Sequence, residues 1–220
     1  MRIRPVLILP VALALALPAF AAQDIDKVNG SITVEAGETA GNLETVNGSI
    51  RIGANAKTGR AETVNGSITV AENVQAGGLE TVNGSIRVAG NGTLTSGLET
   101  VNGGVFVDRG GKVQGSIETV NGAVGLVDTD LSGDITTMNG DVTVGVGSHV
   151  KGGIRYRKPT RQWFSFDRRD PRVIIGPNAV VDGPLTFERK VELYVHNTAR
   201  TGAITGATAV KFDGATPPIN

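Results

Sequence analysis

Apolar and polar positions alternate along short segments of the chain, and each of these segments follows an Asn-Gly pair. After the Gly comes a small or polar residue, then Ile or Val, then any residue, and then Ile, Val or Leu, as in residues 49–52 and 141–144. This period of two predicts a short strand with one buried face. The apolar residues are mostly β-branched, which is typical of strands.

The segment Glu-Thr-Val-Asn-Gly-Ser-Ile begins at Glu44 and recurs at Glu62 and Glu80. Weaker copies extend the register at spacings of 18 or 19 residues. A fixed period of this length is typical of a solenoid, in which each repeat forms one coil. The asparagines that mark the register are Asn29, Asn47, Asn65, Asn83, Asn102, Asn121 and Asn139.

A third, looser apolar position follows in most copies, with a Gly two or three residues later. Each coil therefore has three short sides, and stacked coils pair in parallel about 4.8 Å apart. The sequence predicts an all-β fold, a single-stranded parallel β-solenoid (β-helix) with coils of 18–19 residues. The general preference for right-handed crossovers favours a right-handed coil, although hexapeptide helices depart from it.

Asn-Gly between two apolar runs is also a strong hairpin signal. A hairpin would pair Glu44 with Arg51, but the next copy would pair Glu62 with Thr69, so the charge pairing does not persist. We therefore place Asn-Gly at a sharp corner that uses positive φ, with amides hydrogen-bonded from coil to coil. At this corner Val46 is expected to turn inward.

Residues 1–21 have the composition of a cleaved signal peptide. Arg2 and Arg4 precede an apolar run that is too short to span a bilayer, and an Ala-x-Ala sequence ends at Ala21. The sequence thus predicts export to the periplasm or the outer cell surface, without a transmembrane segment. The absence of cysteine excludes disulfides and thiolate metal sites.

The rest of the chain divides into three parts. Residues 22–150 are predicted to form seven coils. The register is lost over 151–172, which we interpret as a basic and aromatic insertion loop. Short apolar runs separated by Gly then return, so residues 173–220 are expected to continue the solenoid and to close it with a C-terminal cap.

The segment 155–172 holds seven basic side chains and two Asp, whereas the rest of the mature chain is acidic. Aromatic rings stack on sugars, and guanidinium groups pair with phosphates or carboxylates. One hypothesis is that the loop contacts an envelope glycan, glycolipid or anionic surface, with no nucleic acid expected. The alternative is that its aromatic residues pack against the rod. The candidate contact residues are Tyr156, Arg157, Lys158, Arg161, Trp163, Phe164, Phe166, Arg168 and Arg169.

A carboxylate precedes Asn by three positions in most copies, and stacking would align these groups in a column. Neighbours at this spacing repel by about 1 kcal/mol even in water, so the column is a candidate site for cations such as calcium. The alternative is that the carboxylates are solvated and that Arg51, Arg60 and Arg87 reduce the repulsion between them. The column comprises Asp26, Glu44, Glu62, Glu80, Glu99 and Glu118.

Signals of catalysis are weak. His149 and His196 are too few for a three-histidine zinc site within one chain, although trimeric hexapeptide enzymes share ligands between subunits. Only residues 155–172 could offer the charged cleft of a polysaccharide lyase. We predict no catalytic residue, no metal site and no cofactor.

The run 131–144 contains two Gly-Asp-[Ile/Val] units seven residues apart, and 40–50 and 113–124 follow the same form. From 28 to about 150 the chain resembles the adhesin-type β-strand repeats of bacteria. This resemblance implies a β-solenoid and an envelope or surface location, and the family has no established activity or site residues. The tail resembles the bactofilins, which are polymer-forming but cytoplasmic. Polymerisation would require exposed strand edges at the terminal coils.

The sequence therefore favours an exported, non-catalytic β-solenoid that is a structural or adhesive component of the bacterial envelope. A second hypothesis is a binding module that contacts the envelope through residues 155–172. A hexapeptide-type or lyase-type enzyme is the third.

Overall fold

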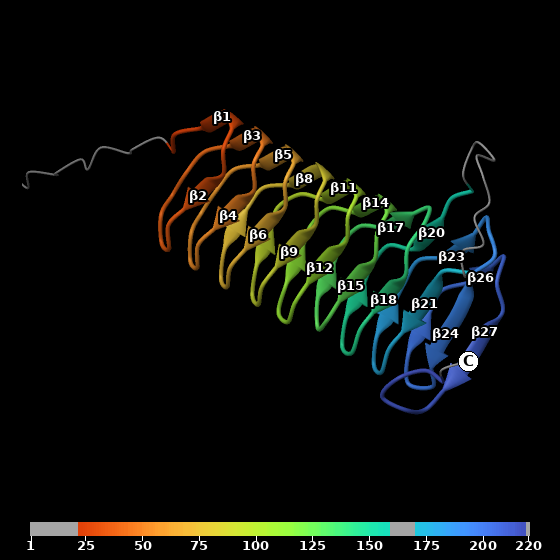
Figure 1. Ribbon diagram of the computed structural model, residues 1–220. Helices are drawn as coiled ribbons and strands as arrows, with labels where there is room; N and C mark the ends of the chain where they lie inside the picture. Colours follow the sequence, from red (N-terminus) through yellow and green to blue (C-terminus); the bar gives the residue numbers. More distant parts are fainter. Residues whose placement is uncertain (1–21, 159–169, 219–220) are drawn as a thin grey trace, which may run out of the picture.

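The chain forms an all-β rod of stacked coils in a computed structural model that describes residues 22–158 and 170–218 (Figure 1). The strands of each sheet pair in parallel with strands one coil away, and the described residues complete about nine turns. The β-solenoid prediction is confirmed, and the hairpin alternative is wrong for every strand pair in the described residues.

Three sheets form the walls of the rod, here called sheets A, B and C. Sheet A contains β1 (Ile25–Asn29), β3 (Leu43–Asn47), β5 (Ala61–Asn65), β8 (Leu79–Asn83), β11 (Leu98–Asn102), β14 (Ile117–Asn121), β17 (Ile135–Thr137), β20 (Ile154–Tyr156), β23 (Leu185–Phe187) and β26 (Ile204–Thr205). Sheet B contains β2 (Ile32–Val34), β4 (Ile50–Ile52), β6 (Ile68–Val70), β9 (Ile86–Val88), β12 (Val105–Val107), β15 (Val124–Leu126), β18 (Val142–Val144), β21 (Arg172–Ile175), β24 (Glu192–His196) and β27 (Ala209–Phe212). Sheet C contains β7 (Gln75–Ala76), β10 (Thr93–Leu94), β13 (Lys112–Val113), β16 (Asp130–Leu131), β19 (His149–Val150), β22 (Val180–Val181) and β25 (Arg200–Thr201).

The core is a set of apolar columns that run along the rod. In β4, Ile50 and Ile52 are buried and Arg51 between them is exposed, and the same alternation recurs in β6 and β9. Each side chain stacks on its equivalent in the next coil, as Ile50 does on Ile68. One coil cannot bury these residues alone, so stability comes from stacking.

The insertion is shorter than predicted. Seven coils precede residue 151, as expected, but the register continues beyond it, because Ile154 pairs with Ile135 in sheet A. Sheet B resumes where Val173 pairs with Val142. The paired register of the described residues is therefore interrupted between β20 and β21, at the corner where earlier coils carry Asn-Gly. Residues 1–21 and 159–169, which include the predicted signal peptide and most of the loop, lie outside the described residues.

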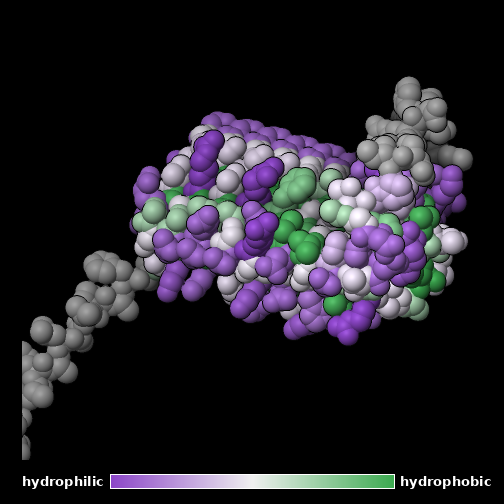
Figure 2. All heavy atoms as spheres, turned by 90° about the horizontal axis from the view of Figure 1, so that it is seen from below, coloured by the Kyte–Doolittle hydropathy of each residue, from purple (hydrophilic) through white to green (hydrophobic). Residues whose placement is uncertain are grey.

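The two ends of the rod expose strands that pair on one side only. These are β1 and β2 at one end and β25, β26 and β27 at the other. At the C-terminal end, Ile204, Ala207 and Ala209 pack on the core but stay partly exposed, and Figure 2 shows apolar side chains gathered there. No described segment closes the last coil in the way that the predicted cap would.

Candidate functional site

A continuous ladder of asparagine side chains follows the corner between sheets A and B. Each Nδ2 donates to the Oδ1 of the asparagine one coil earlier over 2.9–3.1 Å. The ladder joins all seven asparagines of the register, so the predicted amide stacking is confirmed. The predicted positive φ is wrong for them. The left-handed non-glycine residues lie instead at the corner between sheets B and C, at Asn55, Asn73, Asn91, Asp128 and Asn178.

The Gly after each ladder asparagine except Asn29 is required by the close approach of successive coils. A Cβ on Gly66 or Gly84 would overlap the carbonyl oxygen of the Gly one coil earlier. The Ser that follows in four copies has a related role, because the backbone N–H of Ser67 donates to Ser49 Oγ at 3.3 Å. Contacts between coils therefore explain the whole Asn-Gly-Ser sequence.

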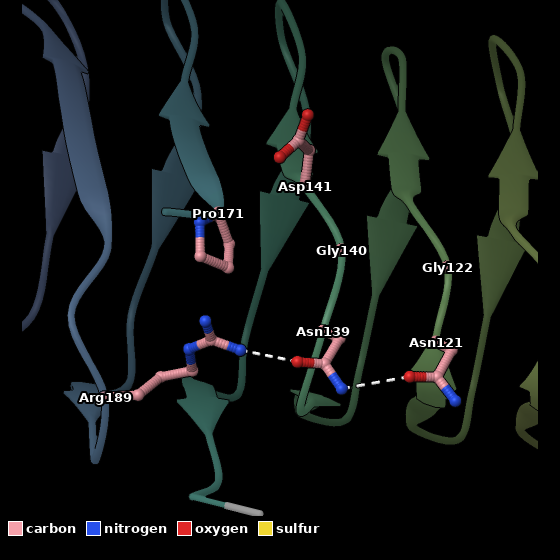
Figure 3. A pocket seen from close by; sticks show the side chains of 7 residues that line it. All are labelled: Asn121, Gly122, Asn139, Gly140, Asp141, Pro171 and Arg189. Carbon is pink, nitrogen blue, oxygen red and sulfur yellow. Dashed lines mark hydrogen bonds between the residues drawn. The ribbon is translucent and has the colours of Figure 1, made fainter. Parts of the chain in front are cut away.

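The ladder ends at Arg189, which the sequence analysis missed. Its Nη1 donates to Asn139 Oδ1 at 2.5 Å and to the Met138 carbonyl at 3.1 Å. The guanidinium group lies beside a hollow of about 410 Å³ that Asp141 and Pro171 also line (Figure 3). Arg189 is far from Asn139 in sequence and outside the repeat, so no sequence pattern linked them.

The predicted carboxylate column exists on the outer face of sheet A. The register places Asp26, Glu44, Glu62, Glu80, Glu99 and Glu118 side by side. Desolvation, followed by the charges of Glu80 and Glu118, raises the pKa of Glu99. No group of three or more His, Cys, Asp or Glu in residues 22–158 and 170–218 is arranged to hold a metal ion, so cation binding stays a prediction.

Only one of the three arginines that were expected to reduce the repulsion within the carboxylate column forms an ion pair with it. Arg60 Nη1 lies 2.8 Å from Glu62 Oε1. Arg51 and Arg87 belong to sheet B, and the Arg87 guanidinium carbon lies 5.1 Å from the centre of the Phe106 ring.

The expectation that Val46 turns inward is wrong. Thr45 is buried, and Val46 is 38% exposed. Val28, Val64 and Val101 are exposed in the same way, so a stripe of apolar side chains lies between the carboxylate column and the asparagine ladder. A shallow hollow follows these columns from Glu80 to Met138 and reaches Arg157.

Tyr156 is a core residue, so its prediction as a surface contact is wrong. It is completely buried in β20, and its ring lies 5.6 Å from that of Phe187. Burial raises its pKa well above the ordinary tyrosine value. Arg157 and Lys158 are exposed, as predicted. The other six candidates lie outside the described residues: Arg161, Trp163, Phe164, Phe166, Arg168 and Arg169.

The two histidines have separate, local partners. His149 Nε2 lies 2.6 Å from Asp182 Oδ2 on sheet C. His196 is buried in β24, where its ring nitrogens contact Thr198 Oγ1 and the Asp213 carbonyl, and its ring packs edge-on against Phe212. Neither arrangement supports the shared zinc site of the enzyme hypothesis.

Within the described residues no helix is long and apolar enough to cross a membrane. Comparisons with protein-family models, curated protein sequences and solved structures found no match.

Proposed function

We propose that this chain is an exported, non-catalytic β-solenoid that serves as a structural or adhesive component of the bacterial envelope, and that it works as a single rod. Self-association through the terminal coils is the competing hypothesis, because open strand edges can template pairing with another chain. The observation that carries the proposal is the position of one lysine at each end of the rod.

Lys27 occupies the interior position that Thr45 takes one coil later. Lys211 occupies the interior position of Val195 at the opposite end. Both side chains are exposed because no coil covers them. A copy stacked on either end would bury an ammonium group, which is costly without an opposite charge; Lys27 Nζ donates only to a neutral acceptor, the Ser31 carbonyl, at 2.8 Å. Inward-pointing charges on edge strands are a known protection against such pairing.

Light scattering and electron microscopy of residues 22–220 test this proposal. The wild-type rod should be monomeric. The double variant Lys27→Thr with Lys211→Val should form assemblies that grow with concentration, because both ends become apolar. The matched control, Lys57→Thr with Lys112→Val, removes the same charge from exposed positions on the sheet C side of the coil and should stay monomeric. Filaments of the wild-type protein would contradict the proposal.

Export and envelope association need a separate experiment. The full-length chain, produced in a bacterium, should appear in the periplasmic or surface fraction with its N-terminus at residue 22. Recovery of the uncleaved chain in the cytoplasm would refute the export part of the proposal and leave the single-rod part unaffected.

A second candidate function is envelope binding through residues 155–172. It is favoured by the exposed Arg155, Arg157 and Lys158, which lie in or directly after the strand β20. Arg157→Ala with Lys158→Ala should weaken retention on anionic envelope lipid or glycan. Lys57→Ala with Lys112→Ala provides a control of equal charge, and equal retention of the two variants would reject this function.

A further inference from the structure

The seven Asn-Gly pairs of the ladder differ in how the glycine nitrogen is held. In the first six, the Gly N–H donates to the backbone carbonyl of the asparagine one coil later, over 2.9–3.2 Å. Gly140 has no such bond to any residue of the described chain. The register places Lys158 one coil after Asn139, and the Lys158 carbonyl does not accept from Gly140.

Asn139 also differs in the environment of its amide carbonyl. The Nδ2 group donates to Asn121 Oδ1 at 2.9 Å, which identifies the atom facing Arg189 as Oδ1. The guanidinium donor lies 2.5 Å from this oxygen. A charged donor withdraws electron density from a carbonyl and stabilises negative charge that develops on its oxygen during attack. The hollow beside Asn139 and Gly140 admits water (Figure 3).

We propose that Asn139 is a site of spontaneous deamidation, with Arg189 as a positioning and polarising residue. After loss of its proton to hydroxide, the Gly140 nitrogen attacks Asn139 Cγ. The new N–Cγ bond forms, the Cγ–Nδ2 bond breaks, and ammonia leaves with a proton from water, which produces a cyclic succinimide. Water then opens either carbonyl of the ring and yields aspartate or isoaspartate. No oxidant or reductant takes part.

The product would change the end of the ladder. A carboxylate at position 139 keeps an acceptor for Arg189 and gains an ion pair with it. It loses the N–H that Asn121 Oδ1 accepts. Isoaspartate also lengthens the main chain at a corner where the Gly140 and Gly122 backbones are in close contact. The modification would therefore detach the last rung of the ladder beside the insertion.

The chain contains its own controls. Asn29 is at the other end of the ladder, but its neighbour Gly30 donates to the Asn47 carbonyl at 2.9 Å. An eighth Asn-Gly pair, Asn91–Gly92, lies at the other corner, where Asn91 has φ 59°. The Gly92 N–H also has no hydrogen-bond acceptor in the described chain, but no guanidinium contacts Asn91 Oδ1 there. Within the part of the chain that the structure describes, neither pair combines a glycine N–H that lacks an acceptor with a guanidinium on Oδ1.

Peptide mapping by mass spectrometry after incubation at mildly alkaline pH measures all eight sites together. Asn139 should lose its amide at least about tenfold faster than the other six ladder sites, because their glycine N–H must first leave a backbone hydrogen bond. It should also react faster than Asn91, whose Oδ1 no guanidinium contacts in the described chain. A rate at Asn139 no higher than at Asn29 or Asn121 would overturn the proposal. In denaturant the preference for Asn139 should disappear.

Variants of Arg189 test its role separately. Arg189→Gln should slow the reaction at Asn139 severalfold, and Arg189→Lys should recover part of the rate because the charge is kept. The rates at the other seven sites report whether each variant is still folded, and they should not change. An unchanged rate at Asn139 in Arg189→Gln would overturn the assignment of Arg189.

Discussion

The hydroxyl of Tyr156 donates a 2.7 Å hydrogen bond to the carbonyl oxygen of Gly140, and Thr63 makes the same contact with Gly48 at 2.8 Å. Tyr156 stands in the column of interior threonines, one coil beyond Thr137. In most coils one buried hydroxyl therefore satisfies the corner carbonyl that faces the core, as buried polar groups require. Thr137 is the exception, because its Oγ1 has no hydrogen-bond partner within the described chain.

Thr81→Val should lower the free energy of unfolding by about 1–3 kcal/mol, because it keeps the side-chain shape but leaves the Gly66 carbonyl without its donor. Thr69→Val on the exposed face of β6 should change stability by less than about 0.5 kcal/mol. Urea denaturation compares the two, and equal midpoints would show that the interior hydroxyl contributes nothing.

Gly84→Ala should destabilise the rod by about 1–3 kcal/mol or prevent folding, because its Cβ would meet the Gly66 carbonyl carbon and oxygen of the preceding coil. Gly90→Ala is the matched control, since the one neighbour within 4 Å of its Cβ would be the Arg109 carbonyl oxygen at 3.3 Å. Thermal unfolding followed by circular dichroism should separate them clearly. A folded Gly84→Ala protein with unchanged stability would contradict the close approach of the coils.

Asn55 is held at φ 60°, which costs an ordinary side chain roughly 1–2 kcal/mol. Asn55→Gly should therefore be nearly neutral, and Asn55→Ala should lower stability by about 1 kcal/mol. At Asn47, which is not left-handed, both substitutions remove the ladder bonds, so Gly should not be better than Ala there. Denaturation midpoints of the four variants decide whether backbone conformation is what Asn55 supplies.

Glu99→Gln should stabilise the rod at neutral pH by less than about 1 kcal/mol. Because its pKa is raised in the folded state, Glu99 is protonated more readily there than in the unfolded chain. The contribution of protonated Glu99 to folding stability is fully present at pH values below the ordinary glutamate pKa. It is lost as the pH rises through the raised pKa of the folded state. The advantage of Glu99→Gln should therefore be absent at low pH, grow just above the ordinary glutamate range, and shrink in high salt.

Denaturation at a series of pH values measures this effect. Glu72→Gln, in an exposed turn outside the column, is the control and should show no such growth with pH. A pH-independent difference between Glu99→Gln and the wild type would mean that the column does not act on Glu99.

The sequence by itself determined the coil length, the three walls, the asparagine ladder and the carboxylate column. Each of these features is repeated once per coil, and parallel stacking brings equivalent residues together whatever the detailed shape of the coil. The interior alternation of Ile50 and Ile52 was predictable for the same reason, because it depends on the pleat of a single strand.

Only the tertiary structure decided the features that depend on contacts outside the repeat. Thr45 faces the core and Val46 faces out because a hydroxyl must reach the Gly30 carbonyl across the corner, and residue spacing does not encode which carbonyl points inward. The burial of Tyr156 follows from the same contact. Arg189 reaches Asn139 because the chain passes the same corner again two coils after the ladder stops. That proximity exists only once the chain has folded.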